Sequence, residues 1–326
     1  MKPHALALAM LLALPAHAAY HVVRHIAIGG SGGWDYLTVD SRAHRLYVSH
    51  SDRVEVVDLD KHALAGSITG LSGVHGIAIA PDVKRAYISN GRSGIVTIFD
   101  TTTLKTIKEV KATGDNPDAI LYEPYGHRIW TFNGRGHNAT VFDEDGNVLG
   151  TVALDGKPEA GVSDERGRVY VNIEDKSELA VIDVKTMTVA KTYPLAPCES
   201  PSGLAINGER DRLFSVCENQ TMAIVGEDSG RVIATAPIGS GVDGAAADNK
   251  RHLAFSSNGA DGSITVVDQK SAKVVETVPT ARGARTIAID PTTGHLFVST
   301  AKLQAVEGQR RPRAVEGTFE VIEVAP

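Results

Sequence analysis

The amino-acid sequence predicts an all-β protein, a seven-bladed β-propeller with four antiparallel strands per blade. A three-part motif recurs along the chain at intervals of 40 to 43 residues, and Gly (32) and Pro (14) are frequent among the 326 residues. Repeats of this length with four short strands each are typical of propeller blades, and frequent Gly and Pro argue against long helices. The seven copies begin at Trp34, Val74, Pro117, Pro158, Pro201, Val242 and Ala284.

Each copy contains a small-apolar run, an aromatic-centred run and an alternating run that mostly ends in Asp. In the second copy these runs are 74–81, 85–90 and 96–100, and a fourth Val/Ile run follows in most copies, as at 232–235. The last copy ends after its third run, at 318–324, whereas 21–28 ahead of the first copy resembles a fourth strand. We therefore expect the N-terminal strand to supply the outer strand of the last blade. This pairing would close the ring and remove an open sheet edge.

Residues 1–18 have the features of a cleaved signal peptide. Lys2 precedes an apolar run at 5–14, and 16–18 reads Ala-His-Ala, a small-x-small cleavage site. The run is shorter than the roughly 20 residues that span a bilayer. We expect cleavage near Ala18, a periplasmic or secreted product with no membrane span, and a monomer. Residues 19–326 are then one propeller domain with a loop insertion at 301–318.

The net charge and the absence of several sequence motifs indicate which functions the sequence disfavours. The formal net charge is −6, which disfavours nucleic acid as a partner without removing it from consideration, since such partners favour basic surfaces. The chain contains no H-E-x-x-H, no C-x-x-C, no phosphate loop and no dinucleotide fingerprint. No catalytic residue is therefore assigned, and whether the protein is an enzyme stays open, with binding preferred.

The repeats resemble a known family. The segments 86–90 (AYISN), 114–117 (GDNP) and 180–183 (AVID) resemble parts of the YVTN repeat found in YncE-like seven-bladed propellers. This resemblance covers nearly all of 20–326. It implies a propeller fold and a binding scaffold, and it implies no single activity or cofactor.

In a propeller the inner strands line a central channel, and the loops between blades share one face with the loops joining second and third strands. Polar residues at equivalent repeat positions therefore form rings at the channel mouth on that face. The second residue of each inner strand, the end of the second strand and the turn after it supply the predicted site. These residues are Asp35, His75, Asp118, Glu159, Asp243, Arg285, Asn90, Asn133, Arg92 and Arg135.

Two ligand chemistries fit this set. Carboxylate and amide oxygens suit one divalent cation, with Glu159, Asn133, Asn172 and Asp243 as the candidate ligands. Arginines suit an anionic group, and Arg92, Arg135 and Arg285 are the candidates. The alternative is that the ring residues cap loop amides and line a water-filled channel. The cofactor is therefore unknown, with one divalent cation as a hypothesis.

Two other features bear on this face. Cys198 and Cys217 both lie on it, and an oxidising compartment favours a disulfide between them over two free thiols or a soft-metal site. The 301–318 insertion contains Arg310, Arg311 and Arg313 and can serve either as a partner contact or as a solvated loop.

The opposite face is expected to be structural. The Asp residues that end third strands are explained there by turn capping; they are Asp58, Asp100, Asp143, Asp183 and Asp268.

The sequence thus predicts an exported propeller that binds a small ligand, a metal or a partner macromolecule at its loop-rich face, without catalysis. One alternative is a metal-dependent, lactonase-like hydrolase with the cation at the channel mouth. A second is a scaffold for another periplasmic protein, through the 301–318 loop, or for single-stranded nucleic acid.

Overall fold

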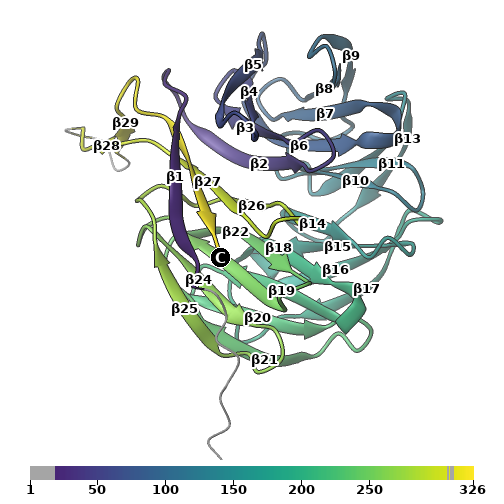
Figure 1. The fold of residues 1–326 in the computed structure, drawn as a ribbon. Coiled ribbons are helices and arrows are strands. Elements are labelled where there is room, and N and C mark those ends of the chain that lie inside the picture. Colours follow the sequence, from purple (N-terminus) through teal and green to yellow (C-terminus); the bar gives the residue numbers. More distant parts are fainter. Residues whose placement is uncertain (1–18, 307, 309–311) are drawn as a thin grey trace, which may run out of the picture.

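Seven four-stranded antiparallel sheets are arranged around a central channel in the computed structural model, which describes residues 19–306, 308 and 312–326 (Figure 1). The inner strands are β2 (Trp34–Asp40), β6 (Val74–Ala80), β10 (Pro117–Glu123), β14 (Pro158–Ser163), β18 (Pro201–Asn207), β22 (Val242–Asp248) and β26 (Ile287–Ile289). The second strands are β3 (Arg45–His50), β7 (Arg85–Asn90), β11 (Arg128–Asn133), β15 (Arg168–Ile173), β19 (Arg212–Cys217), β23 (Leu253–Asn258) and β27 (Leu296–Thr300). The predicted fold class is confirmed.

The outer half of each blade follows the same order. The third strands are β4 (Arg53–Asp58), β8 (Ile95–Asp100), β12 (Asn138–Asp143), β16 (Glu178–Asp183), β20 (Thr221–Gly226), β24 (Ser263–Asp268) and β30 (Glu320–Ala325). The fourth strands are β5 (Ala63–Ile68), β9 (Thr106–Lys111), β13 (Val148–Ala153), β17 (Thr188–Pro194), β21 (Val232–Pro237), β25 (Val274–Pro279) and β1 (His21–Ala27). Three single-turn 3₁₀ helices complete the described elements: η1 (Pro81–Val83), η2 (Glu174–Lys176) and η3 (Gly208–Arg210). The predicted signal peptide, residues 1–18, and the predicted Arg310 and Arg311 lie outside the described residues.

Six of the seven inner strands begin at the predicted residue, and the seventh begins later. β26 starts at Ile287 rather than at Ala284. The preceding residues bond to the first blade instead of to their own second strand. Arg285 donates to the carbonyl of Trp34 at 2.8 Å, and the Thr286 hydroxyl donates to the carbonyl of Asp35 at 2.6 Å. The last blade is therefore fastened to the first at the channel mouth.

The ring closes through the N-terminal strand, as predicted. β1 pairs antiparallel with β30, from His21 opposite Ala325 to Ala27 opposite Glu320, so the sheet order is β1-β30-β27-β26.

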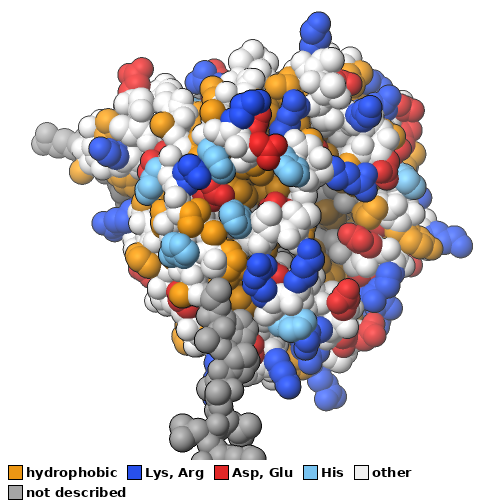
Figure 2. Space-filling view, viewed as in Figure 1, with side chains coloured by type: hydrophobic (Ala, Val, Ile, Leu, Met, Phe, Trp, Pro, Cys, Tyr) orange, Lys and Arg blue, Asp and Glu red, His pale blue; other side chains and the backbone are white. Residues whose placement is uncertain are grey.

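Ionic contacts reinforce this closure. The buried carboxylate of Glu323 on β30 lies 3.3 Å from the Arg24 guanidinium, 2.7 Å from His295 and 3.4 Å from His62. Figure 2 shows histidine side chains gathered around β1 in this view, among acidic and basic ones. The joint between the two ends of the chain is thus strengthened by charge as well as by strand pairing.

The core lies between adjacent blades, where the second and third strands bury their aromatic and branched side chains. Trp130, Phe132 and Val171 belong to one such cluster, and each has an exposed fraction of 0%. Burying a side chain of this kind stabilises the fold by about 1.5–3 kcal/mol. The alternation of apolar residues in the sequence therefore becomes inter-blade packing.

The inner strands approach each other too closely for large side chains. A Cβ added at Gly203 would lie 2.5 Å from the Ala245 nitrogen, and one at Gly244 would lie 2.7 Å from the Ile287 nitrogen. The small-apolar run in each copy thus reflects the narrow channel. Tyr36 on β2 is the exception among the third residues of the seven repeat copies.

Three of the blades also carry an internal polar pair between the second and third strands. The amide of Asn90 donates to the Thr97 hydroxyl at 3.1 Å, and Asn133 donates to Thr140 at 2.9 Å. The Asn258–Thr265 pair repeats this contact at 2.9 Å. Because both partners of each pair are buried, the recurring Asn joins the second strand to the third inside the blade.

The 301–318 insertion contains a short hairpin, in which β28 (Leu303–Gln304) pairs with β29 (Arg313–Ala314). In the part of the chain that the structure describes, no helix has the length and hydropathy needed to cross a membrane.

Candidate functional site at the channel mouth

Backbone hydrogen bonds bring two kinds of loop together around the mouth. The Gly91 nitrogen, in the turn between β7 and β8, donates to the Gly73 carbonyl just before β6 at 2.8 Å. Gly134 bonds in the same way to Asn116, at 3.0 Å, before β10. The residue after each inner-strand start therefore lies beside the second-to-third-strand turn of its own blade.

Three ring residues from blades one to three converge. The His75 Nδ1 lies 2.6 Å from the Asp35 Oδ2 and 3.3 Å from the Asp118 Oδ1. The chain of charges continues through Arg285, which lies 3.2 Å from the Asp35 Oδ1 and 2.7 Å from the Asp243 Oδ2. Five of the predicted residues thus form one continuous network across the mouth.

The sixth predicted ring residue, Glu159, has a different partner. Its carboxylate lies 2.6 Å from the Lys157 ammonium, which also contacts Glu174. Among the described residues, Asp118 forms no ion pair with a lysine or arginine; its Oδ1 faces His75, and its Oδ2 accepts a hydrogen bond at 3.2 Å from Asn116. Negative charge is therefore least compensated at Asp118.

Burial changes the acid–base behaviour of the ring. Burial and the nearby charge of Asp35 raise the pKa of Asp118 to about 6, against the opposing effect of His75. Burial and Asp118 raise the pKa of Glu159 to about 8, although Lys157 lowers it. Burial and Asp35 raise the pKa of Asp243 to about 7, although Arg285 lowers it. Removing carboxylates from water next to like charges disfavours their ionised form.

Opposite charge has the converse effect on His75. Burial alone would lower the pKa of this imidazole, but the hydrogen bond that it donates to Asp35 and the charge of Asp118 outweigh burial and raise the pKa.

The predicted asparagines are buried, Asn90 and Asn133 inside their own blades and Asn172 against the next blade. Asn90 and Asn133 are at most 1% exposed and make the Asn–Thr contacts described above. Asn172 is also fully buried; its amide donates to the carbonyls of Ser202 and Gly203, and its oxygen accepts from Ser215. These contacts occupy the amide groups, so Asn133 and Asn172 are not free to join Glu159 and Asp243 around a cation.

Two cavities divide the mouth by charge. A cavity of 610 Å³ is lined by Asp35, His75, Arg92, Arg135 and Arg285, among others. A cavity of 520 Å³ lies against the same ring and is predominantly acidic. The charged residues of the second cavity are Asp35, Asp118, Lys157, Glu159, Glu218, Asp243 and Arg285.

Arg92 and Arg135 differ from Arg285 in their surroundings. Both are exposed, and neither forms an ion pair with another described residue. They also line an adjoining cavity of 370 Å³ with Lys111. The arginine half of the mouth therefore carries positive charge that the protein does not neutralise.

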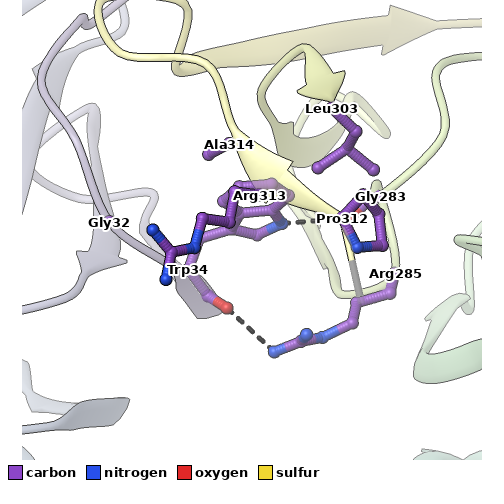
Figure 3. Close-up of a pocket in the computed structure, with 9 residues that line it drawn as sticks. Gly32, Trp34, Gly283, Arg285, Leu303, Pro312, Arg313 and Ala314 are labelled. Carbon is purple, nitrogen blue, oxygen red and sulfur yellow. Dashed lines mark hydrogen bonds between the residues drawn. The ribbon is translucent and has the colours of Figure 1, made fainter. Parts of the chain in front are cut away.

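A fourth cavity is formed under the insertion. It has a volume of 490 Å³ and shares Gly33, Trp34 and Arg285 with the 610 Å³ cavity. Figure 3 shows Leu303, Pro312, Arg313 and Ala314 of the insertion around Trp34 and Arg285. The indole of Trp34 is fixed by a 3.0 Å hydrogen bond to the Gly283 carbonyl. The insertion thus adds a largely apolar wall beside the polar mouth.

The cysteines form the predicted disulfide. Cys198, before β18, is bonded to Cys217 at the end of β19, with their Cα atoms 5.7 Å apart. Both are buried, so the bond ties the loop ahead of the fifth blade to that blade's second strand.

His50, the other imidazole near this face, does not line the mouth. It is buried, lies 3.2 Å from Glu55 and stacks on Phe319 with ring centroids 4.1 Å apart. Gly30 covers it so closely that an added Cβ would lie 2.9 Å from the ring.

Sequence reasoning missed three mouth residues: Tyr36, Asn116 and Lys157. Tyr36 lines both the acidic cavity and a 140 Å³ cavity within the channel. Burial, followed by the charges of Asp118 and Glu159, raises the pKa of its phenol. A signal was present, because Tyr36 is the one large residue at a position otherwise held by small ones, and Asn116 and Lys157 directly precede inner strands.

The fold and this mouth define the class: a seven-bladed β-propeller whose loop-rich face carries a polar, cavity-lined site. The chain is similar to YncE, and the predicted resemblance to YncE-like propellers is confirmed. It is 24% identical over 187 residues to the uncharacterized YncE proteins of Salmonella typhi and Salmonella typhimurium. The match covers 55% of this chain and 52% of either relative, so the chain spans about half the length of the curated relatives it matches.

No family model matches the chain. Among solved structures, a chain of Kuenenia stuttgartiensis hydrazine synthase superposes with a TM-score of 0.74 at 16% identity, covering 82% of this chain and 92% of that one. At this identity the likeness concerns the fold alone.

Proposed function

We propose that the protein is a binding protein, without turnover, that recognises a small anionic molecule at the arginine half of the channel mouth. The observation that carries this proposal is the pair of exposed guanidiniums, Arg92 and Arg135, that line a 610 Å³ cavity without an ion-pair partner among the described residues. Guanidinium groups bind carboxylates and phosphates through paired hydrogen bonds. A carboxylate or phosphate is therefore the group we expect between them.

The cavity under the insertion indicates that the ligand also has an apolar group. The 490 Å³ space under the insertion shares Trp34 with the 610 Å³ cavity and is lined by Leu303, Pro312 and Ala314. Ligand sites combine apolar walls with a few placed polar groups. A molecule with an apolar group next to its anionic group would fill both cavities.

The disulfide supports the location predicted from the first 18 residues. Structural disulfides persist in oxidising compartments, and Cys198 and Cys217 form one. We therefore propose that the protein acts in the periplasm or outside the cell.

Tryptophan fluorescence offers a direct test, because the sequence contains two tryptophans and Trp130 is fully buried. Titration with an aryl carboxylate such as benzoate, with succinate and with inorganic phosphate should change the emission of Trp34, most strongly with the aryl carboxylate. Replacing both Arg92 and Arg135 by Ala should weaken binding by about tenfold or more, since each charge-assisted hydrogen bond contributes about 1.5–3 kcal/mol.

Arg231 provides the matched control. It is exposed, has no ion-pair partner among the described residues, and lies in the turn between β20 and β21 on the opposite face. Arg231→Ala should leave binding unchanged. Equal loss in the Arg231 variant, or full binding in the Arg92/Arg135 variant, would refute recognition at the mouth. Binding of a single-stranded oligonucleotide in place of all three anions would favour nucleic acid instead.

A further inference from the structure

We propose that Asp35, His75 and Asp118 bind one divalent transition-metal cation, with Zn²⁺ as the representative ion. Among the described residues, this is the one group of three or more His, Cys, Asp or Glu side chains whose ligand atoms all lie within 4.8 Å of one another. The three residues come from three successive blades, so their convergence depends on the closed ring. The inference is separate from the anion proposal, because the cation needs neither Arg92 nor Arg135.

The ligand atoms already stand near the positions that a metal requires. Zinc binds histidine nitrogen and carboxylate oxygen at about 2.0–2.2 Å, which places neighbouring tetrahedral ligand atoms about 3.4 Å apart. The His75 Nδ1 and the Asp118 Oδ1 are 3.3 Å apart. The Asp35 Oδ2, at 2.6 Å, needs to move back by about 0.8 Å as the metal replaces the shared proton.

Each carboxylate is held by a group outside the trio. The Asp35 Oδ1 accepts from Arg285 at 3.2 Å, which leaves its Oδ2 facing His75. The Asp118 Oδ2 accepts from Asn116 at 3.2 Å, which leaves its Oδ1 facing the same nitrogen. Such outer contacts orient the ligands of protein metal sites. Asp35 and Asp118 are therefore already oriented by neighbouring groups, as the ligands of protein metal sites are.

The imidazole is also fixed in orientation. A Cβ added at Gly91 would lie 2.6 Å from the His75 Nε2 and 2.7 Å from its Cδ2, so this edge of the ring packs against the Gly91 backbone. The Nδ1 edge is consequently the one that faces the two aspartates.

Charge and ligand type favour a transition metal. Arg285 is shared by Asp35 and Asp243, and Lys157 by Glu159 and Glu174. Among the residues that the structure describes, Asp118 forms an ion pair with His75 alone. A dication would compensate this excess. Imidazole combined with carboxylate suits Zn²⁺ and related ions, whereas Ca²⁺ and Mg²⁺ prefer oxygen ligands only.

The test is a calorimetric titration of the untagged, disulfide-bonded protein with ZnCl₂ after removal of chelator. We expect one Zn²⁺ per chain, and a weaker response to CaCl₂. His75→Gln and Asp118→Asn should each lower the Zn²⁺ affinity by about tenfold or more, and Asn116→Ala, which removes an orienting contact, by about tenfold. Substitution of Co²⁺ should give a visible absorption band that the His75 variant loses.

His44 is the matched control, because it forms an exposed histidine–aspartate pair with Asp60 at 2.9 Å and has no second carboxylate ligand. His44→Gln should retain full affinity, as should the Arg92/Arg135 variant. The site is refuted if wild-type protein binds no stoichiometric Zn²⁺, or if stoichiometric binding survives in both His75→Gln and Asp118→Asn. Stoichiometric Zn²⁺ binding by a wild-type protein that binds none of the three anions would refute the proposed function and leave this site intact.

Discussion

Each face of the propeller carries a set of carboxylates at a recurring position of the repeat. The two sets differ in their surroundings. At the ends of third strands, Asp100 and Asp183 accept hydrogen bonds from the backbone nitrogens of Thr103 and Thr186, at 2.6 and 2.7 Å. These bonds lower the pKa of both groups. At the channel mouth, burial and neighbouring like charges raise the pKa of Asp118, Glu159 and Asp243.

The direction of the pKa shift distinguishes carboxylates that stabilise the native state from carboxylates that destabilise it. A carboxylate with a lowered pKa stabilises the native state when ionised, whereas one with a raised pKa destabilises it. Groups that cost stability are found preferentially at functional sites. The mouth is therefore the part of the ring that we connect with ligand binding, whereas the carboxylates of the opposite face stabilise the turns between third and fourth strands.

Removing the central cation of the mouth should produce the largest effect. Arg285→Met would leave Asp35 and Asp243 without their shared partner, which should destabilise the protein by about 2 kcal/mol after allowance for the partial exposure of the guanidinium. Chemical denaturation at pH 7.5 measures this. Adding Asp243→Asn should recover part of the loss, and an undiminished loss in the double variant would contradict the charge argument.

Removing a cap on the opposite face should produce a smaller effect. Asp183→Ala deletes the acceptor of the Thr186 nitrogen and hydroxyl bonds and should cost about 1 kcal/mol. Since the pKa of Asp183 is lowered, its contribution is present above the unfolded pKa, near 3.9, and disappears as the pH falls through the folded value. Thermal unfolding at pH 7 and pH 3 should show this, with Asp183→Asn, which keeps an acceptor, as the milder control.

Neutralising a mouth carboxylate should have the opposite sign. The pKa of Glu159 is raised to about 8, so its ionisation reduces stability progressively between about pH 4.3 and pH 8. In the presence of EDTA, Glu159→Gln should melt several °C above wild type at pH 8.5 and equal to it at pH 4. A lower melting temperature at pH 8.5 would show that the Lys157 ion pair outweighs the burial of Glu159.

The fold could be predicted closely because each blade repeats the same local pattern. Chain periodicity predicts the first residue of six inner strands, and strand character at 21–28 predicts the closure. Ala284 was assigned to a strand because the pattern cannot show that Arg285 and Thr286 bond to the first blade.

The site could be predicted only in part. Repeat positions identified Asp35, His75 and Asp118, which do meet. Their pairing with Arg285 and the separate role of Lys157 depend on distances across the channel that no local pattern encodes. Asn133 was assigned to the mouth although its spacing of seven residues to Thr140, shared with Asn90 and Thr97, indicates a contact inside the blade.

In our account, the capping aspartates stabilise the native state when they are ionised, whereas the ionised carboxylates of the channel mouth destabilise it. Carbon-13 NMR of the side-chain carboxyl groups, in metal-free protein labelled at Asp and Glu, tests it most directly. A pH titration should show Asp100 and Asp183 releasing protons below the ordinary aspartate pKa, and Asp118 and Asp243 releasing theirs well above it. Mouth aspartates that titrate at or below the values of the capping aspartates would contradict the account.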